Sequence, residues 1–464
     1  MSSLAIQLRS TVERKLFGTD GIRGVAGAFP LDPETTFAIG RALGHHIART
    51  RKRARAVIGQ DTRESGRTIA DSVATGLSVA GIEVRSAGVI TTPGIAYLAR
   101  AERFDAGIVI SASHNPWTDN GIKVFGADGY KLPDEIELEI EHELFTLLAD
   151  EAAITVPATQ EGTLPGEAGL RGAYLTWLRG NTDAGRFRGL KLVVDCANGA
   201  ASELVEELFR SCGVKATFIN CASDGCNINE QCGALHPDVV ARAVTEAGAD
   251  VGITFDGDAD RALFADHQGR VVNGDAILLL AARQMKAHGT LAGDKVVATT
   301  MSNMGLEAAL KRSGISMMRA PVGDKYVLEQ MQKTGATLGG EQSGHIIFRD
   351  GEATTGDGLL TALRALEIVG RSGKPLAELI ADLKVFPQTI KNVRVREKKA
   401  LLGIPSIAQA IRQAESELDG NGRVVVRYSG TEALARVMVE AESEQTMHRI
   451  ADSIVDAIQQ NLGV

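Results

Sequence analysis

The chain repeats one pattern of apolar and polar positions three times. In each copy a short apolar run leads into a polar loop, a helical stretch follows, and a glycine separates that helix from a second apolar run. The copies span residues 56–88, 191–219 and 294–321. A helix that ends at a glycine between two strands is typical of a βαβ unit. The pattern therefore predicts three similar α/β domains in tandem, and the copies are too widely spaced for a solenoid.

Two further apolar runs resemble each other. DAGIVIS at 105–111 and DVGITFD at 250–256 each lead directly into a loop rich in Gly, Ser and Asp. Because α/β sheets bind ligands beyond the carboxyl ends of their strands, we expect the chemistry at 111–116 and 256–261. Buried strands share Val and Ile runs by chance as well, which is the alternative explanation of the similarity.

The last 80 or so residues follow a different pattern. Two alternating or apolar runs, RVVVRYS and ARVMVEAE, precede an amphipathic helix that begins near Glu444. This order is typical of a smaller α+β domain. We therefore expect four domains, at residues 1–165, 166–270, 271–385 and 386–464.

Composition narrows the class of protein. Of the 464 residues, 44% are hydrophobic and 23% are charged, which is the balance of a soluble globular enzyme rather than of a disordered chain. The net charge of −8 argues against a general nucleic-acid binder. No apolar run approaches the ~18 residues that span a bilayer. We therefore expect neither nucleic acid nor a membrane as a partner.

The cysteines and the charged segments bear on the compartment. The N-terminal segment carries charges and no apolar core of a secretory signal. The five cysteines predict reduced thiols and a cytoplasmic location, and their C-x4-C-x5-C spacing lacks the CxxC pair of a zinc knuckle.

The basic run RTRKRAR at 49–55 follows a predicted helix whose N-cap is Asp32, and its cations suit the end of that helix. An RNA contact is the alternative.

One loop has the composition of a divalent-cation site. Asp256, Asp258 and Asp260 alternate with small residues, and their carboxylates would repel one another without a cation. An EF-hand is excluded because its sixth position is Arg261 rather than Gly and its twelfth is His267 rather than Glu. An aspartyl-phosphate motif also fits poorly, since Asp260 stands where Thr or Val belongs. Three carboxylates leave Mg²⁺ open positions that a phosphate oxygen can fill.

Three other loops carry weaker signals. SASHNP places Ser113 beside the imidazole of His114, although an ordinary loop is an equal alternative. GGEQSGH at 339–345 holds a carboxylate and a hydroxyl two residues apart, which could grip vicinal sugar hydroxyls or form a simple turn. RYSGTE, with Arg436 beyond it, gathers two guanidinium groups, two hydroxyls and glycine amides, a phosphate-binding set that an exposed hairpin would not explain.

These four motifs, in this order, resemble the α-D-phosphohexomutase superfamily over nearly the whole chain. KLFGTDGIRG at 15–24, NINEQCG at 227–233 and VGDKYV at 322–327 are similar to its bacterial phosphoglucosamine mutase family. Ala259 departs from the more usual Gly, and Ala433 stands where Pro is common, which we expect to loosen that loop.

The resemblance implies an α/β fold with three tandem similar domains of mixed sheets and a smaller, mobile C-terminal α+β domain around a central cleft. The implied reaction interconverts glucosamine 6-phosphate and glucosamine 1-phosphate through a phosphoserine and a 1,6-bisphosphate, in UDP-N-acetylglucosamine biosynthesis. The implied cofactors are one Mg²⁺ per chain and a hexose 1,6-bisphosphate as activator and intermediate. Sugar phosphates are the implied partners, and the chain would be a monomer or a homodimer.

The resemblance also implies roles for single residues. Ser113 matches the serine that is phosphorylated and that lends a phosphate oxygen to the metal. The other matches are Asp256, Asp258 and Asp260 for the metal; Glu341 and Ser343 for the sugar hydroxyls; Arg427, Ser429, Gly430, Thr431 and Arg436 for the non-reacting phosphate; His114, Lys123, Arg261 and His345 for acid–base or charge-stabilising work; and Arg23 and Arg63 for support of the cleft.

Two other functions remain open from the sequence. One is a phosphomannomutase/phosphoglucomutase of broader sugar tolerance, which belongs to the same class. The other is a non-catalytic protein that binds a sugar phosphate or a cation, which binding without turnover would reveal.

Overall fold

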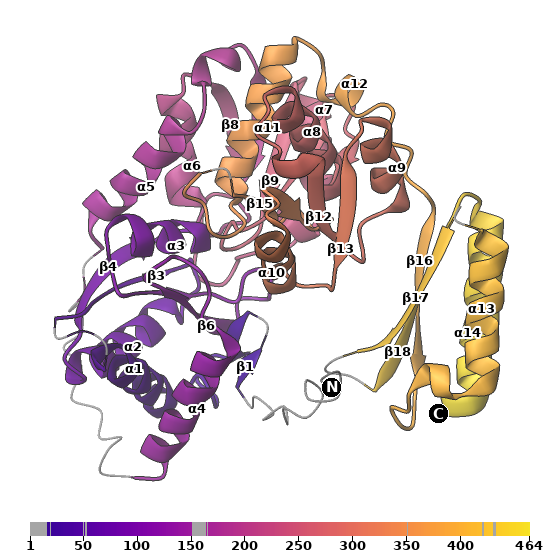
Figure 1. The fold of residues 1–464 in the computed structure, drawn as a ribbon. Helices are drawn as coiled ribbons and strands as arrows, with labels where there is room; N and C mark the ends of the chain where they lie inside the picture. The colour runs from indigo at the N-terminus through magenta and orange to yellow at the C-terminus, as the bar shows by residue number, and fades with distance from the viewer. Residues whose placement is uncertain are drawn as a thin grey trace. The chain divides into compact units, whose positions relative to one another are not determined.

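A computed structural model describes residues 16–18, 20–49, 51, 53–150, 164, 166–349, 351–419, 422–429 and 433–464. Within these residues the chain forms four β-sheets (Figure 1). The chain divides into two compact units. The larger one runs up to Met301 and also contains Met317–Ile380, and the smaller one contains Ser302–Ser316 and Ala381–Val464. No helix in this part of the chain is long and apolar enough to cross a membrane.

The first sheet has the strand order β1-β2-β6-β5-β3-β4. Strand β3 is parallel to β4 and β5, whereas β6 is antiparallel to β5 and β2. Ile58 and Ile108 belong to the core formed with α1, α2 and α4, while Gly59 and Gly107 lie against Ile95 of α3. Helices therefore cover both faces of a mixed sheet. The elements are β1 Phe17–Gly18, β2 Gly21–Val25, α1 Pro33–Ala48, β3 Arg55–Gln60, α2 Gly66–Val79, β4 Glu83–Val89, α3 Thr92–Ala101, β5 Ala106–Ile110, β6 Asp119–Gly126 and α4 Asp134–Leu148.

The second sheet, β11-β10-β9-β7-β8, repeats part of this arrangement. Its strand β9 lies between the parallel β7 and the antiparallel β10, as β5 lies between β3 and β6. The predicted similarity of 105–111 and 250–256 is thus a structural equivalence. The elements are α5 Ala168–Gly180, β7 Lys191–Asp195, α6 Ser202–Ser211, β8 Lys215–Ile219, α7 Pro237–Ala247, β9 Val251–Phe255, β10 Ala262–Asp266 and β11 Val271–Val272, with 3₁₀ turns at Ala184–Arg186 and Gly233–Leu235.

The third sheet, β13-β12-β14-β15, supplies a third copy of the same arrangement. Strand β14 lies between the parallel β12 and the antiparallel β15. The expectation of three similar α/β domains with mixed sheets is therefore confirmed. The elements are α8 Gly274–Ala287, β12 Lys295–Thr299, β13 Ser316–Ala320, α10 Asp324–Thr334, β14 Leu338–Gly340, β15 Ile346–Phe348, α11 Gly358–Ser372 and α12 Leu376–Leu379, with a 3₁₀ turn at Ala292–Asp294.

The smaller unit contains the fourth sheet, in which β16 and β17 flank β18 and both are antiparallel to it. Helices α13 and α14 pack on this sheet around one apolar core, as Figure 1 shows in yellow. The predicted α+β domain with a closing helix is confirmed. The elements of this unit are α9 Met304–Arg312, β16 Gln388–Arg394, α13 Pro405–Leu418, β17 Gly422–Tyr428, β18 Leu434–Ala441 and α14 Glu444–Leu462, with a 3₁₀ turn at Leu401–Gly403.

Helix α1 begins as the sequence predicts. Asp32 accepts a hydrogen bond from the backbone N–H of Thr35 at 2.9 Å, and a cap of this kind contributes about 1 kcal/mol. In the basic run that follows α1, the guanidinium of Arg51 lies 3.4 Å from the carboxylate of Asp105 in the same domain. This pairing sets one cation of the run against the first domain, and both interpretations of the run stay predictions.

Candidate active site

Three loops of the larger unit leave equivalent positions in the three sheets. Each joins a central strand to its antiparallel neighbour, namely β5 to β6, β9 to β10 and β14 to β15. The first loop contacts the second through Ser113 and Asp256, and the second contacts the third through Asp260 and His345. The structure therefore brings three of the four predicted motifs together.

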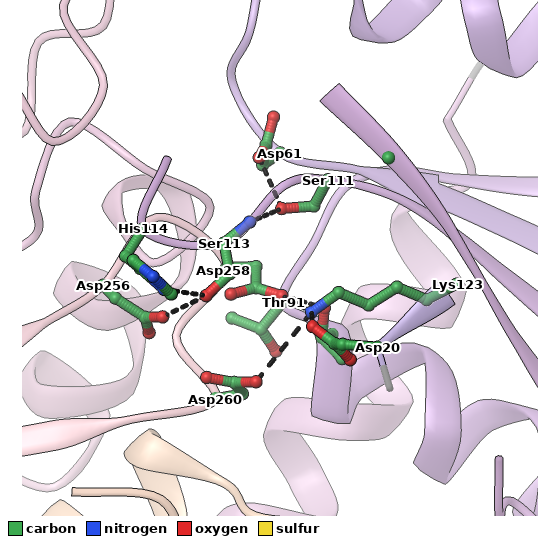
Figure 2. Close-up of polar contacts among 12 residues, drawn as sticks. Asp20, Asp61, Thr91, Ser111, Ser113, His114, Lys123, Asp256, Asp258 and Asp260 are labelled. Carbon is green, nitrogen blue, oxygen red and sulfur yellow. Dashed lines mark hydrogen bonds and ion pairs between the residues drawn. The ribbon is translucent and has the colours of Figure 1, made fainter. Parts of the chain in front are cut away.

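The hydroxyl of Ser113 faces the carboxylates of the second loop (Figure 2). Its Oγ donates to Oδ2 of Asp256 at 2.6 Å and lies 3.3 Å from Nδ1 of His114. The Oγ of Ser111 instead donates to Asp61 at 2.6 Å and accepts the N–H of Ser113 at 2.9 Å. Ser113 has a φ of 53°, a left-handed conformation that costs a non-glycine residue about 1–2 kcal/mol. Of the two serines, it is thus Ser113 that meets the aspartates.

Asp256, Asp258 and Asp260 form a buried group whose ligand oxygens lie within 4.8 Å of one another. The Oδ1 atoms of Asp258 and Asp260 are buried without a hydrogen-bond partner, a costly state that a bound cation would relieve. Burial and the charges of Asp260 and Asp258 raise the pKa of Asp256 well above its ordinary value. The group is therefore suited to a metal ion.

No other set of three or more His, Cys, Asp and Glu side chains within the described ranges could hold a metal ion. The five cysteines are all free thiols. The cysteines accordingly form no metal cluster in the part of the chain that the structure describes.

Lys123 places a buried positive charge beside the aspartates (Figure 2). Its Nζ lies 2.7 Å from Oδ2 of Asp258, 3.0 Å from Oδ2 of Asp20 and 3.9 Å from Oδ2 of Asp260. Burial acts to lower the pKa of Lys123, but the charges of Asp20 and Asp258 outweigh it and hold that pKa above its ordinary value. A permanently charged ammonium is what a developing anionic phosphoryl group needs.

Two histidines border the site with opposite pKa shifts. Burial and the positive charge of Arg261 lower the pKa of His114 to about 4, so its ring is neutral at pH 7. Burial also acts to lower the pKa of His345, but the charge of Asp260, 3.5 Å away, outweighs it and raises that pKa to about 9. In the neutral form of the ring, Nε2 of His345 accepts the N–H of Gly356 at 3.1 Å and the proton sits on Nδ1, toward Asp260. The protonated ring, which the raised pKa favours at pH 7, carries a proton on both nitrogens and gives up that hydrogen bond.

A polar cavity of about 450 Å³ adjoins these groups. Oε1 of Glu341 accepts the N–H of Gly323 at 3.1 Å, which packs 322–324 beside the third loop. Ser343 is half-buried on the same turn as Glu341. A cavity of this size and polarity admits a small charged ligand. Its lining includes Asp20, Arg23, His114, Asp260, Arg261, Val322, Asp324, Glu341 and His345.

The fourth motif belongs to the smaller unit. Arg427 on β17 lies directly opposite Arg436 on β18, and Ser429 follows the end of β17. Like charges opposite each other in a sheet destabilise it, and an anion between them would offset that repulsion. Gly430 and Thr431, predicted to share this site, lie outside the described residues.

Three residues that lie at the site, Lys131, Asp20 and Asp324, are not among the predicted site residues. Nζ of Lys131 lies 2.6 Å from Oδ1 of Asp20 and 2.5 Å from Oδ2 of Asp324, so it links the first domain to the third. Asp20 lies in KLFGTDGIRG and Asp324 in VGDKYV, two stretches that indicated only the resemblance to the family. Lys131 stands in no motif, and no sequence signal would have found it.

Comparison with known families covers most of the chain. Domains I, II and III of the alpha/beta/alpha type and the C-terminal domain of "Phosphoglucomutase/phosphomannomutase" match residues 14–150, 173–269, 273–386 and 390–457 respectively. The chain belongs to the phosphoglucomutase/phosphomannomutase family. Members of this family are phosphohexomutases, which are isomerases of sugar phosphates.

Relatives within the phosphoglucomutase/phosphomannomutase family extend over nearly the full length. A protein of Koribacter versatilis (strain Ellin345) named phosphoglucosamine mutase is 60% identical over 453 residues, which are 97% of this chain and 98% of that protein. A phosphoglucosamine mutase of Solibacter usitatus (strain Ellin6076) is 53% identical over 450 residues, 97% of this chain and 99% of its own.

Solved structures of the family have the same fold. A phosphoglucomutase/phosphomannomutase family protein of Burkholderia thailandensis is 27% identical, with a TM-score of 0.78 over 96% of this chain and 99% of that one. An Aspergillus fumigatus N-acetylphosphoglucosamine mutase, solved with GlcNAc-6P and magnesium, is 20% identical, with a TM-score of 0.64 over 96% of each chain. At that identity the second likeness concerns the fold alone.

Proposed function

We propose that the chain is a phosphoglucosamine mutase, which interconverts glucosamine 6-phosphate and glucosamine 1-phosphate. The observation that carries the proposal is the 2.6 Å contact between the Ser113 hydroxyl and the buried aspartate group. A serine in that position can accept a phosphoryl group beside a metal ion, which is the requirement of a phosphoserine mutase. The full-length relatives named phosphoglucosamine mutase support the same substrate.

The reaction balances as two phosphoryl transfers. In the first, the phosphoryl group leaves Oγ of phospho-Ser113 and bonds to the free hydroxyl of the sugar phosphate, whose proton is released, giving a 1,6-bisphosphate. In the second, the other phosphoryl group of the bisphosphate bonds to Oγ of Ser113, and the serine proton returns to the sugar oxygen. Asp256 and His114 lie 2.6 and 3.3 Å from that Oγ and are the candidates to take its proton.

The charged groups have separate parts in this scheme. Lys123 and Arg261 stabilise the negative charge of the moving phosphoryl group. One Mg²⁺ at Asp256, Asp258 and Asp260 would add positive charge at the same place when bound. Glu341 and Ser343 would hold sugar hydroxyls, and the arginines of β17 and β18 would bind the phosphate that does not react.

The cavity lining holds carboxylates beside the cations Arg23 and Arg261. Asp20, Asp324 and Glu341 all border the space beside the third loop. The protonated amine of glucosamine carries the positive charge that such carboxylates attract. Glucose and mannose phosphates lack that charge. Since Asp20 and Asp324 are already paired with Lys131, Glu341 is the carboxylate left for the amine, and the preference for glucosamine rests mainly on the relatives named phosphoglucosamine mutase.

The test is an isomerisation assay of the purified full chain. Glucosamine, glucose, mannose and N-acetylglucosamine 6-phosphates are compared with Mg²⁺ and glucose 1,6-bisphosphate present. We expect glucosamine 6-phosphate to give the highest kcat/KM. A tenfold preference for mannose 6-phosphate, ~1.4 kcal/mol in the wrong direction, would contradict the substrate assignment. Binding without turnover of any sugar would show a non-catalytic protein.

A second arm of this assay addresses the metal. EDTA should abolish turnover and added Mg²⁺ should restore it, because the aspartate group needs a cation to neutralise it. Undiminished activity in EDTA would remove the metal from the mechanism. The cytoplasmic location, the monomer or homodimer, and the four domain boundaries stay predictions.

A further inference from the structure

The stretch NINEQCG belongs to a loop of the second domain that reaches the serine loop of the first. We call residues 220–233 the docking loop. The backbone N–H of Glu64, in the first domain, donates to the carbonyl of Gly225 at 2.9 Å. Within the docking loop, Asn229 is buried, and its own N–H donates to the carbonyl of Ala197 at 2.9 Å. The loop is therefore anchored in both domains.

The side-chain amide of Asn229 is aimed at the backbone of Ser113. Its Nδ2 donates to the carbonyl of Ser113 at 2.9 Å and to that of Asn115 at 3.2 Å. Only the NH2 end of the amide can face two carbonyl oxygens, because they offer no proton. A residue of the second domain thus fixes the peptide of the serine that the proposed function phosphorylates.

Arg63 holds the same peptide from within the first domain. Its fully buried guanidinium donates through Nη2 to the carbonyls of Ser113 and Asn115, at 2.9 Å each. Its Nε donates to Asp61, which also accepts the hydroxyl of Ser111. Because the hydroxyl of Ser111 accepts the N–H of Ser113, both ends of this residue are fixed.

The contacts of Asn229 and Arg63 hold Ser113 in a left-handed backbone conformation. A non-glycine residue at a φ of 53° persists only where its surroundings hold it. The same amide also touches the metal loop, because a Cβ at Gly257 would lie 2.9 Å from Nδ2 of Asn229 and 2.5 Å from the carbonyl of Ser113. Asn229 therefore sits where the serine loop, the metal loop and the docking loop meet.

We propose that Asn229 is a positioning residue for phosphoryl transfer, which sets the direction of the Ser113 hydroxyl relative to the aspartate group. This inference rests on the proposed function, since it assigns a role around the serine that carries the phosphoryl group. Displacement of a reacting atom by about 1 Å can slow a reaction about 100-fold. The loss of the amide should accordingly slow transfer to and from Ser113 without weakening the binding of the sugar phosphate.

The test compares Asn229→Gly with Asn220→Gly in the full chain. Both residues are left-handed asparagines of the docking loop, with φ of 59° and 50°, so glycine suits either backbone. The amide of Asn220 donates to Asp195 at 3.0 Å, within the second domain, which makes this variant the matched control. For each protein one measures kcat, KM for glucosamine 6-phosphate, the unfolding midpoint, and by intact mass the rate at which glucose 1,6-bisphosphate phosphorylates Ser113.

We expect Asn229→Gly to lower kcat and the phosphorylation rate by the same factor, about 10- to 100-fold, with KM within twofold. Asn220→Gly should change kcat less than twofold. Asn229→Asp, which sets a carboxylate against two carbonyl oxygens, should be at least as slow as Asn229→Gly. Rates within twofold of the wild type for either Asn229 variant, or equal losses of kcat at Asn220 and Asn229, would overturn the inference alone. If wild-type Ser113 accepts no phosphate from the bisphosphate, the proposed function fails as well.

Discussion

Thr92 and Asp258 join the first domain to the metal loop by two hydrogen bonds. The N–H of Thr92 donates to the carbonyl of Asp258 at 3.0 Å, and its hydroxyl donates to Oδ2 of the same residue. Lys123 contacts that oxygen too, which leaves Oδ1 of Asp258 for a metal ion. A helix N-terminus of one domain thus orients a carboxylate of another.

The first prediction concerns Thr92. Thr92→Val keeps the shape of the side chain and removes the hydroxyl that orients Asp258, so we expect the Mg²⁺ concentration for half-maximal activity to rise about tenfold. Titration of the activity with Mg²⁺ measures it. Thr92→Ser retains the hydroxyl and should stay near the wild type. Equal Mg²⁺ requirements in the Val and Ser variants would show that the hydroxyl does not orient the ligand.

The second prediction separates the two serines of SASHNP. Ser113→Ala should lose nearly all turnover, because no other hydroxyl of this loop meets Asp256. Ser111→Ala should keep phosphate on Ser113 but turn over more slowly, since Ser111 holds the Ser113 N–H at 2.9 Å. Peptide mass mapping of active protein, with assays of both variants, checks this. Phosphate on Ser111 together with an active Ser113→Ala would refute the assignment.

The third prediction concerns the fourth motif. Arg427→Ala should raise KM for glucosamine 6-phosphate about tenfold and change kcat less, because under the proposed function the arginine binds a phosphate that stays in place during each transfer. Steady-state kinetics measure both constants. Arg412→Ala, an exposed position on α13, serves as the control and should leave both unchanged. An unaltered KM in Arg427→Ala would exclude this loop as the phosphate site.

The fourth prediction is a dependence of stability on pH. Burial raises the pKa of Asp357, which caps helix α11, to about 6, although its hydrogen bonds to Leu360 and Tyr174 oppose the shift. The folded protein therefore holds this proton more tightly than the unfolded chain, so the stabilisation is complete below pH ~4 and is lost as the pH rises through 6. A pKa that is higher by about two units in the folded protein corresponds to ~3 kcal/mol in the free energy of unfolding.

Comparison with Asp357→Asn isolates that contribution, because asparagine keeps an oxygen for the helix cap and does not titrate. The free energy of unfolding of the wild type should fall relative to the variant between pH 4 and 6, as measured by urea unfolding at fixed ionic strength. A difference that is constant across this range, or that grows in favour of the wild type, would contradict the raised pKa.

The fold could be inferred from the sequence where a pattern repeats. DAGIVIS and DVGITFD read as the same strand, and β5 and β9 are equivalent. The equivalent strand of the third domain, β14, cannot be recognised from the sequence because it is only three residues long and two of them are Gly339 and Gly340, which leave almost no apolar run. A Cβ at Gly339 would lie 2.5 Å from the sulfur of Met331, so packing in this domain favours glycine over an apolar residue there.

The site could be inferred only as separate loops. Residues within one motif are visible in the sequence, but contacts such as that of Thr92 with Asp258, 166 positions apart, depend on the packing of one domain on another. The two stretches NINEQCG and VGDKYV, which indicate the family, also differ in the loops that they contact. NINEQCG meets the serine loop through Asn229, whereas VGDKYV borders Glu341 through Gly323. Of the two, only VGDKYV lines the cavity beside Glu341, so under the proposed function it is the stretch placed to influence the choice of sugar.

The equivalence of the three loops also has a consequence for how such a protein can diversify. Each loop is the turn between a pair of neighbouring strands in its own sheet, so a change in one turn leaves the strand pairing of the other two sheets intact. A gene that arose by repeated duplication of one α/β domain would carry three such turns, and each turn could acquire a different function. Under the proposed function, exchanging 322–323 and 341–344 between homologues, with Asp324 and His345 kept, is therefore a route to new sugar preferences that leaves the groups around Ser113 and the aspartates in place.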